Sequence, residues 1–213
     1  MSVGIVDHGL PYDTHNLYDV TFYAHTIHTL LTNAPSMVDS WLSDITTQQP
    51  TAGGPLIVGL DIEWRPNFRR NMQNPVAILQ LCVGQRCLIF QILHSPDIPK
   101  SLIDFLGNAN HTFVGVGIEE DAEKLIEDYS LTVATTVDLR KLAEEKLGAR
   151  ELRNSGLKTL AMRVLGKEIE KPKTVSRSRW DNLWLTPWQV QYAYIDAFIS
   201  FEVARCLYAG NVL

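Results

Sequence analysis

An apolar run that ends in two carboxylates, LIVGLDIE at Leu56–Glu63, most constrains what this chain can fold into. Such a run is typical of a strand that is buried on both faces. Asp61 and Glu63 lie two residues apart at its end, and because side chains alternate along a strand, both carboxylates point to one face. Two like charges at the edge of an apolar core repel each other and are costly to desolvate, and a shared divalent metal would remove that cost. A strand end that turns into solvent is the ordinary alternative.

The composition is that of a folded domain. The chain has 213 residues, of which 46% are hydrophobic and 20% are charged, so we expect one domain over 1–213. No apolar run is long enough to cross a bilayer, and the first residues do not have the pattern of a secretory signal, so we expect no membrane partner. Cys82, Cys87 and Cys206 are too few for a disulfide framework. We expect them to be reduced, in an intracellular protein of the nucleus and/or cytoplasm that is not secreted.

The net charge of −5 does not suggest nucleic acid as a partner, but the positive charge is grouped. One loop contains Arg65, Arg69 and Arg70. Another segment contains Lys171, Lys173, Arg177 and Arg179. A solvated surface would explain either group alone.

Apolar periodicity predicts alternating strands and helices after an initial run of strands. Strands are expected at Leu17–Ala24, Leu56–Glu63, Val76–Val83, Cys87–Ile92 and His111–Ile118, with a short strand ending near Val137. Helices are expected at Ser36–Ile45, Ile98–Leu106, Glu119–Tyr129, Asp138–Leu147 and Leu157–Leu165. The last helix has Thr186 as its N-cap, Pro187 at its first position, Gln189 three residues after the cap and Gly210 as its stop. This order predicts a three-layer α/β domain with a mixed sheet.

Two further carboxylates stand beside apolar segments. Asp121 opens a helix directly after the strand VGVGI, where open α/β sheets place their sites, although acidic residues also favour the first helical turn. Asp196 lies within the apolar last helix, where a carboxylate needs a partner or a metal. Tyr192 lies four residues earlier on the same helical face, so its hydroxyl and the Asp196 carboxylate can converge on one point. The same spacing also fits simple core packing.

The order of these motifs resembles that of a known enzyme family, the DEDD 3′–5′ exonucleases of the ribonuclease H-like fold. GLDIEWRP resembles the first motif of that family, VAILQLCV its following strand and VGVGIEED its second motif. GLKTLAMRVLG, SRSRW and LTPWQVQYAYIDAF resemble its C-terminal third. The chain is most similar to the Werner syndrome-type exonuclease domain, with ribonuclease D as a more distant relative. The resemblance covers about residues 17–210 and leaves 1–16 as an N-terminal extension.

The resemblance implies a fold, an activity and a site. The fold would be ribonuclease H-like, with a central mixed sheet of five to six strands and helices on both faces. The activity would be hydrolysis of nucleic acid, DNA and/or RNA, from a free 3′ end to nucleoside 5′-monophosphates by a two-metal-ion mechanism. Two Mg²⁺ or Mn²⁺ ions would be held by Asp61, Glu63, Asp121 and Asp196, and Tyr192 would orient the attacking water.

Two positions refine this resemblance. One branch of the family has a histidine five residues before the last aspartate, where this chain has Gln191, so Tyr192 indicates the tyrosine branch (DEDDy). Werner-type domains often carry an aromatic residue two positions after the second-motif aspartate, and this chain has Glu123 there. A carboxylate cannot stack on a base and repels phosphate, so the grip on the terminal nucleotide must differ.

The resemblance also gives the grouped basic residues a function as phosphate contacts: Arg65, Arg69, Arg70, Lys173, Arg177 and Arg179. The sequence leaves open whether a separate helicase or a second copy of the chain is a partner. A catalytically weak or inactive module for nucleic-acid binding or assembly is one alternative, and a ribonuclease H endonuclease is another. The filled acidic positions favour the exonuclease, and an endonuclease would not need Tyr192 four residues before Asp196.

Overall fold

The computed structural model describes residues 3–47, 54–67 and 73–211. Within these residues one sheet contains β1 (Val3–Asp7), β2 (His15–Phe22), β3 (His25–Thr32), β4 (Ile57–Trp64), β5 (Val76–Val83), β6 (Arg86–Phe90), β7 (Thr112–Gly115) and β8 (Thr136–Asp138). The α-helices are α1 (Pro35–Thr47), α2 (Lys100–Leu106), α3 (Ile118–Tyr129), α4 (Leu139–Leu147), α5 (Leu157–Leu160), α6 (Lys173–Ser176) and α7 (Pro187–Ala209). Other helical turns lie at Ile92–His94, Arg150–Asn154 and Ala161–Leu165.

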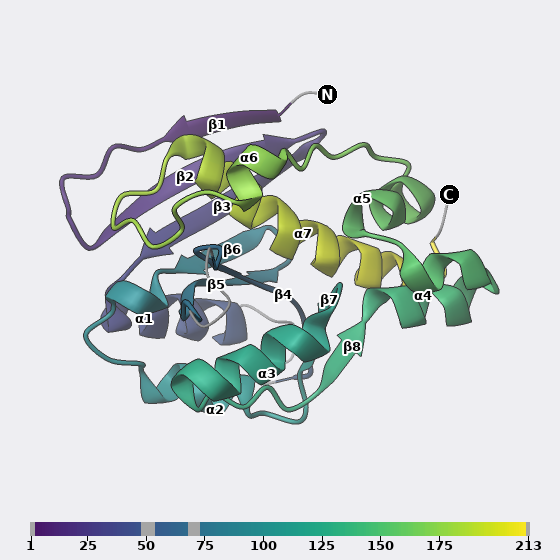
Figure 1. The fold of residues 1–213 in the computed structure, drawn as a ribbon, viewed down its shortest axis with the longest axis horizontal. Coiled ribbons are helices and arrows are strands. Elements are labelled where there is room, and N and C mark those ends of the chain that lie inside the picture. Colours follow the sequence, from purple (N-terminus) through teal and green to yellow (C-terminus); the bar gives the residue numbers. More distant parts are fainter. Residues whose placement is uncertain (1–2, 48–53, 68–72, 212–213) are drawn as a thin grey trace.

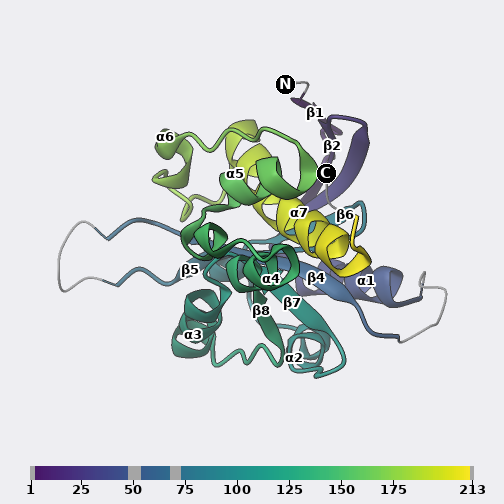
Figure 2. The same ribbon diagram turned by 90° about the vertical axis from the view of Figure 1, so that its right-hand side faces the viewer.

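The elements form three layers, as expected. In Figure 1, α7 lies along one face of the sheet and α1, α2 and α3 lie on the opposite face, and Figure 2 agrees. Each face has its own buried apolar cluster, one under α4, α5 and α7 and the other under α1, α2 and α3. The prediction of an α/β sheet covered by helices on both faces is confirmed.

The strand order is β1-β2-β3-β6-β5-β4-β7-β8, and the sheet is mixed. β4 lies between β5, to which it is antiparallel, and β7, to which it is parallel. Because parallel strands end at the same edge of a sheet, the end of β4 and the end of β7 lie at one edge. That edge presents the predicted acidic motifs.

The sheet is larger than expected, with eight strands in the described residues instead of five or six. The two strands without a predicted counterpart are β1 and β3. β1 is an edge strand that pairs with β2 in the described sheet, and β3 (HTIHTLLT) has three polar residues in its first half. Neither shows the continuous apolar run that made the central strands recognisable.

β7 is shorter than predicted. The expected strand over His111–Ile118 is observed only at Thr112–Gly115, and Ile118 already belongs to α3. Gly117 adopts a left-handed conformation with φ of 77°, which ends the strand and begins the helix. Its N–H donates to the Asp138 carboxylate at 2.9 Å, which fixes this turn.

α7 begins and ends where the sequence predicts. The Gln189 N–H donates to the Thr186 hydroxyl at 3.3 Å, and the Thr186 N–H donates to the Gln189 side-chain oxygen at 3.0 Å. Gly210 ends the helix in the left-handed conformation. Although α7 is long and buried, none of the helices described combines the length and apolar character needed to span a bilayer.

A glycine lets α7 lie directly on β4. A Cβ added at Gly59 would lie 1.9 Å from the carbonyl oxygen of Ala197, so no other residue fits between this strand and the helix. Gly59 shares its strand face with Asp61 and Glu63. This contact therefore fixes α7 at the height of the acidic pair.

The expectation of three reduced cysteines is wrong for one pair. Cys82 and Cys87 are joined by a disulfide across the β5–β6 hairpin, with Cα atoms 4.3 Å apart, whereas Cys206 is free and buried. The number of cysteines does not show which residues of two paired strands face each other. Here the tight turn at Gly84 places Cys82 and Cys87 directly opposite each other. Two cysteines are enough for such a local link.

The contact between Gly59 and α7 predicts that a methyl group added at Gly59 strongly destabilises the protein. Gly59→Ala should lower the free energy of unfolding by about 3 kcal/mol or more, because the helix must move away from the strand. The matched control is Gly4→Ala in β1, where the added Cβ meets only the Thr21 Cβ at 3.9 Å, and its effect should stay within about 1 kcal/mol. Denaturant unfolding measures both, and equal effects would contradict this view of the packing.

Candidate active site

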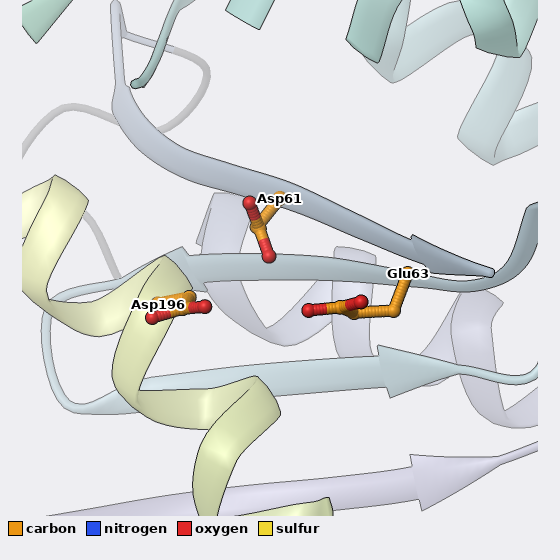
Figure 3. A group of neighbouring side chains, drawn as sticks. All are labelled: Asp61, Glu63 and Asp196. Atoms are coloured by element: carbon orange, nitrogen blue, oxygen red, sulfur yellow. The ribbon is translucent and has the colours of Figure 1, made fainter. Parts of the chain in front are cut away.

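Three carboxylates meet where β4 faces α7. Asp61 and Glu63 from β4 and Asp196 from α7 point toward one another in Figure 3. Each offers one oxygen that lies within 4.8 Å of the other two. Asp196 directly precedes Ala197, whose carbonyl contacts Gly59, so the packing of the helix on the glycine brings the three carboxylates together.

Asp121 lies near this cluster, on the helix that follows the neighbouring strand β7. It lies in the first turn of α3, just after β7 and the Gly117 turn, and it is partly buried. It is not one of the three closely grouped carboxylates, but its charge acts on Asp61 and Glu63 and raises their pKa values. The structure thus places all four predicted carboxylates at one edge of the sheet.

Burial and mutual repulsion make these groups hard to ionise. Burial, followed by the charge of Asp196, raises the pKa of Glu63 to about 9 and that of Asp61 well above its usual value. Burial raises the pKa of Asp121 to about 7, and it also raises the pKa of Asp196. A cluster of this kind favours whatever cation neutralises it, a proton or a metal ion.

Asp138 is a buried carboxylate with a structural role, and its surroundings differ from those of the acidic cluster. It accepts hydrogen bonds from the Gly117 N–H at 2.9 Å and the Arg140 N–H at 2.8 Å, and it pairs with the Arg140 guanidinium. Although burial alone would raise its pKa, these partners lower it. In contrast, the Oδ1 atom of Asp196 is buried without a hydrogen-bond partner among the described residues. A hard divalent cation prefers oxygen ligands of this kind, so the residues fit Mg²⁺ or Mn²⁺.

Tyr192 lies one helical turn before Asp196 and packs against two residues of the preceding segment. The ring centroids of Trp180 and Tyr192 lie 5.9 Å apart, and the Nζ of Lys171 lies 5.2 Å from the ring centroid of Tyr192. Trp180 is fully buried and donates its indole N–H to the Ser176 carbonyl at 3.1 Å. Burial, and then the charge of Asp196, raises the pKa of Tyr192 above its usual value, so the phenol is neutral and can donate a hydrogen bond.

Two residues at this site are not among the predicted site residues. Lys171 places its ammonium 2.8 Å from Oδ2 of Asp196. Gln80 lies directly opposite Asp61 in the β4–β5 register, and both polar atoms of its amide are buried without a partner in the described part of the chain. Gln80 has a signal in the sequence, since it interrupts the apolar strand VAILQLCV. The approach of Lys171 depends on a loop conformation that no periodicity encodes.

Two of the predicted basic residues meet at one aspartate. Arg65 lies 3.2 Å from Oδ2 of Asp181, and Arg179 pairs with the same carboxylate at 3.0 Å. The segment after β4 and the segment before α7 are therefore linked beside the acidic cluster.

Two of the other predicted basic residues, Lys173 and Arg177, do not join this pair in the described part of the chain. Lys173 and Arg177 are exposed, in α6 and directly after it. Arg69 and Arg70 lie outside the described residues. The role of all these residues in binding nucleic acid stays a prediction.

Comparison with known proteins gives this fold and site a family. A family model described as 3′–5′ exonuclease matches residues 35–208. A 3′–5′ exonuclease of Arabidopsis thaliana is 36% identical over 156 residues, which are 72% of this chain and 53% of that protein. The bifunctional 3′–5′ exonuclease/ATP-dependent helicase WRN of Mus musculus is 36% identical over 174 residues, which are 81% of this chain and 12% of that protein. The chain belongs to the 3′–5′ exonuclease family, and it spans about half of the first relative and about an eighth of the second.

Solved structures share the fold at low sequence identity. RNase D of Escherichia coli superposes with a TM-score of 0.68 at 17% identity, over 85% of this chain and 44% of that one. The Nibbler EXO domain of Aedes aegypti also gives a TM-score of 0.68, at 19% identity over 84% of this chain and 86% of that one. The expected ribonuclease H-like fold is therefore confirmed.

The raised pKa of Glu63 predicts how stability depends on pH in the metal-free protein. Because its pKa rises from an ordinary value of 4.5 to about 9 in the folded chain, the contribution of Glu63 to stability is fully present below about pH 4.5 and is lost as the pH rises through about 9. In EDTA, the melting temperature of the wild type should fall between pH 5 and pH 9, and Glu63→Gln should fall less steeply. At pH 8 the variant should be the more stable protein.

The matched control for this experiment is Glu123→Gln, which changes an exposed glutamate of α3. It should keep the pH slope of the wild type. Parallel curves for the wild type and Glu63→Gln would show that Glu63 does not carry the buried repulsion described above.

Proposed function

We propose that this chain is a metal-dependent 3′–5′ exonuclease that hydrolyses nucleic acid, DNA and/or RNA, to nucleoside 5′-monophosphates. One observation carries the proposal: a family member with this fold brings the partly buried Asp61 and Glu63 together with the buried Asp196, whose Oδ1 has no partner among the described residues. A protein that needed these positions only for packing would have no reason to bear that repulsion. Perturbed carboxylates that cluster at a sheet edge are typical of a catalytic site.

Asp61, Glu63, Asp121 and Asp196 would hold two Mg²⁺ or Mn²⁺ ions. When bound, such ions activate a water nucleophile and stabilise the charge on the phosphate and on the leaving 3′ oxygen. The positions of the ions would be set by the carboxylates. Asp61, Glu63 and Asp196 are held in place because β4 and α7 pack directly on each other at Gly59. Two solved structures of the EXD2 exonuclease domain are described as soaked in Mn with dGMP and in Mg with GMP.

Tyr192 would orient the attacking water through its hydroxyl. The phenol is neutral, and its position one turn from Asp196 directs it toward the carboxylates. Packing against Trp180 limits the orientations that the ring can take. The residue would thus act by positioning a hydrogen bond, which fits the tyrosine branch of the family.

The substrate would be a strand with a free 3′ end, held by its phosphates. Arg65 and Arg179 meet beside the cluster at Asp181, and Lys173 and Arg177 extend the positive charge along the same segment. Arg69 and Arg70, which follow β4 in the sequence, would complete this set. Glu123 is exposed in α3 and would keep phosphates away from that side.

The remaining proposals concern the surroundings of the enzyme. We place it inside the cell, in the nucleus and/or cytoplasm, where its substrates occur. Unwinding of duplex substrates would come from a separate helicase, and assembly with a second copy is compatible with this site. A catalytically weak binding or assembly module is the alternative function, but it would not need such a repulsive acidic cluster.

The test uses 5′-labelled DNA and RNA, single-stranded and recessed, with Mg²⁺, Mn²⁺ or EDTA. The wild type should shorten the strand from its 3′ end in steps of one nucleotide, only with metal, and should release 5′-monophosphates. Asp61→Asn keeps the size of the side chain but removes a ligand charge, so turnover should fall by at least ~10²-fold.

Two controls make this test specific. Asp104→Asn, an exposed α2 aspartate that pairs with Lys100, should keep the wild-type rate. Circular single-stranded DNA should resist the enzyme, because it has no 3′ end. Cleavage of the circle would indicate an endonuclease, and binding without cleavage of any substrate would indicate the non-catalytic module.

A further inference from the structure

The ammonium of Lys171 pairs with one carboxylate of the acidic cluster, that of Asp196. It is 2.8 Å from Oδ2 of Asp196 and 5.2 Å from the ring centroid of Tyr192. The side chain of Asp196 is 3% exposed, whereas that of Lys171 is 31% exposed. The charge of Lys171 also acts on the other three carboxylates, which are Asp61, Glu63 and Asp121.

Lys171 offsets only part of the charge in this cluster. Three carboxylates lie within 4.8 Å of one another and a fourth lies nearby, but one ammonium carries a single positive charge. Burial alone would lower the pKa of Lys171, but Asp196 and Asp61 outweigh burial and raise it, so the lysine is a cation at every working pH. A divalent ion carries twice that charge and takes several oxygen ligands at once.

The chain around Lys171 is fixed while its side chain has a path to water. Ile169 is fully buried, and the Glu168 N–H donates to the Tyr23 hydroxyl at 3.1 Å. Pro172 follows as the N-cap of α6. The lysine stem has four rotatable bonds and reaches solvent at its exposed side, so the ammonium can leave the cluster by side-chain rotation alone.

We propose that Lys171 is an internal counter-ion of the metal site, which balances the carboxylates while they hold no metal and gives way when a divalent ion binds. The proposal rests on the proposed function, since it takes these carboxylates as the metal ligands. Lys171 is then a positioning residue with two opposite effects. It stabilises the metal-free site, and it weakens metal binding because its charge must be displaced or must repel the incoming ion. Lys171 thereby sets the metal concentration at which the enzyme becomes loaded.

The test measures Mn²⁺ affinity by isothermal titration calorimetry in the wild type and in charge variants. Lys171→Gln keeps a hydrogen-bonding side chain but no charge, and it should bind Mn²⁺ roughly tenfold more tightly, within the usual range of coupling between two sites. Lys171→Arg keeps the charge and should stay within about twofold of the wild type. The matched control, Lys173→Gln, removes an exposed charge two residues away and should also stay close to the wild type.

Thermal unfolding separates this role from simple packing. In EDTA, Lys171→Gln should melt below the wild type, because the carboxylates lose their counter-ion. In saturating Mn²⁺ it should melt no lower than the wild type, because the metal has taken that place. An equal loss in both conditions, or an Mn²⁺ affinity that is unchanged or weaker, would overturn the proposal.

The outcomes also separate this inference from the proposed function. A wild type that binds Mn²⁺ and trims 3′ ends, with unchanged affinity in Lys171→Gln, would overturn only the counter-ion role. A wild type that binds no Mn²⁺ would overturn both.

Discussion

The repulsion between carboxylates that lie close together at the contact of β4 and α7 is the interaction on which the rest of this structure depends. Asp61 and Glu63 reach the contact because a strand places alternate residues on one face, and Asp196 reaches it because Gly59 allows the helix to touch the strand. The fold therefore holds like charges closer than they would lie in water. Rigid packing on both faces of the sheet supplies the stability that this arrangement costs.

The chain stabilises buried carboxylates in two ways. The difference distinguishes a carboxylate with a structural role from one in the candidate active site. Asp138 is surrounded by donors and holds the turn at Gly117, which presents Asp121 at the sheet edge. Asp196 has one ion pair, to Lys171, and an oxygen without a partner in the described residues. The first arrangement is complete without a ligand. In the second arrangement only part of the negative charge is balanced, and Lys171 lies where a metal ion could replace its ammonium.

The parts of the fold that depend on local pattern could be predicted from the sequence. The strand Val76–Val83 is observed at the predicted residues, and α7 begins after Thr186 and ends before Gly210, because continuous apolar runs and capping residues are local signals. β1 and β3 lack such a run. The disulfide between Cys82 and Cys87 depends on hairpin register, which composition does not record.

The site could be predicted to a similar extent. The spacing of Asp61 and Glu63 on a strand, and of Tyr192 and Asp196 on a helix, predicts which side chains share a face. What no spacing predicts is a contact between segments far apart in the chain. Lys171 pairs with Asp196 from the segment between α5 and α6, and Gln80 lies opposite Asp61 through the register of the sheet.

The most direct test of metal binding by this cluster is a crystal structure of the protein grown with Mn²⁺, with the ions located by their anomalous scattering. We expect anomalous peaks bounded by the carboxylates of β4, α3 and α7, with the Lys171 ammonium withdrawn from Asp196. Mn²⁺ absent from the cluster at saturating concentration, with Lys171 still paired to Asp196, would contradict this view of the site.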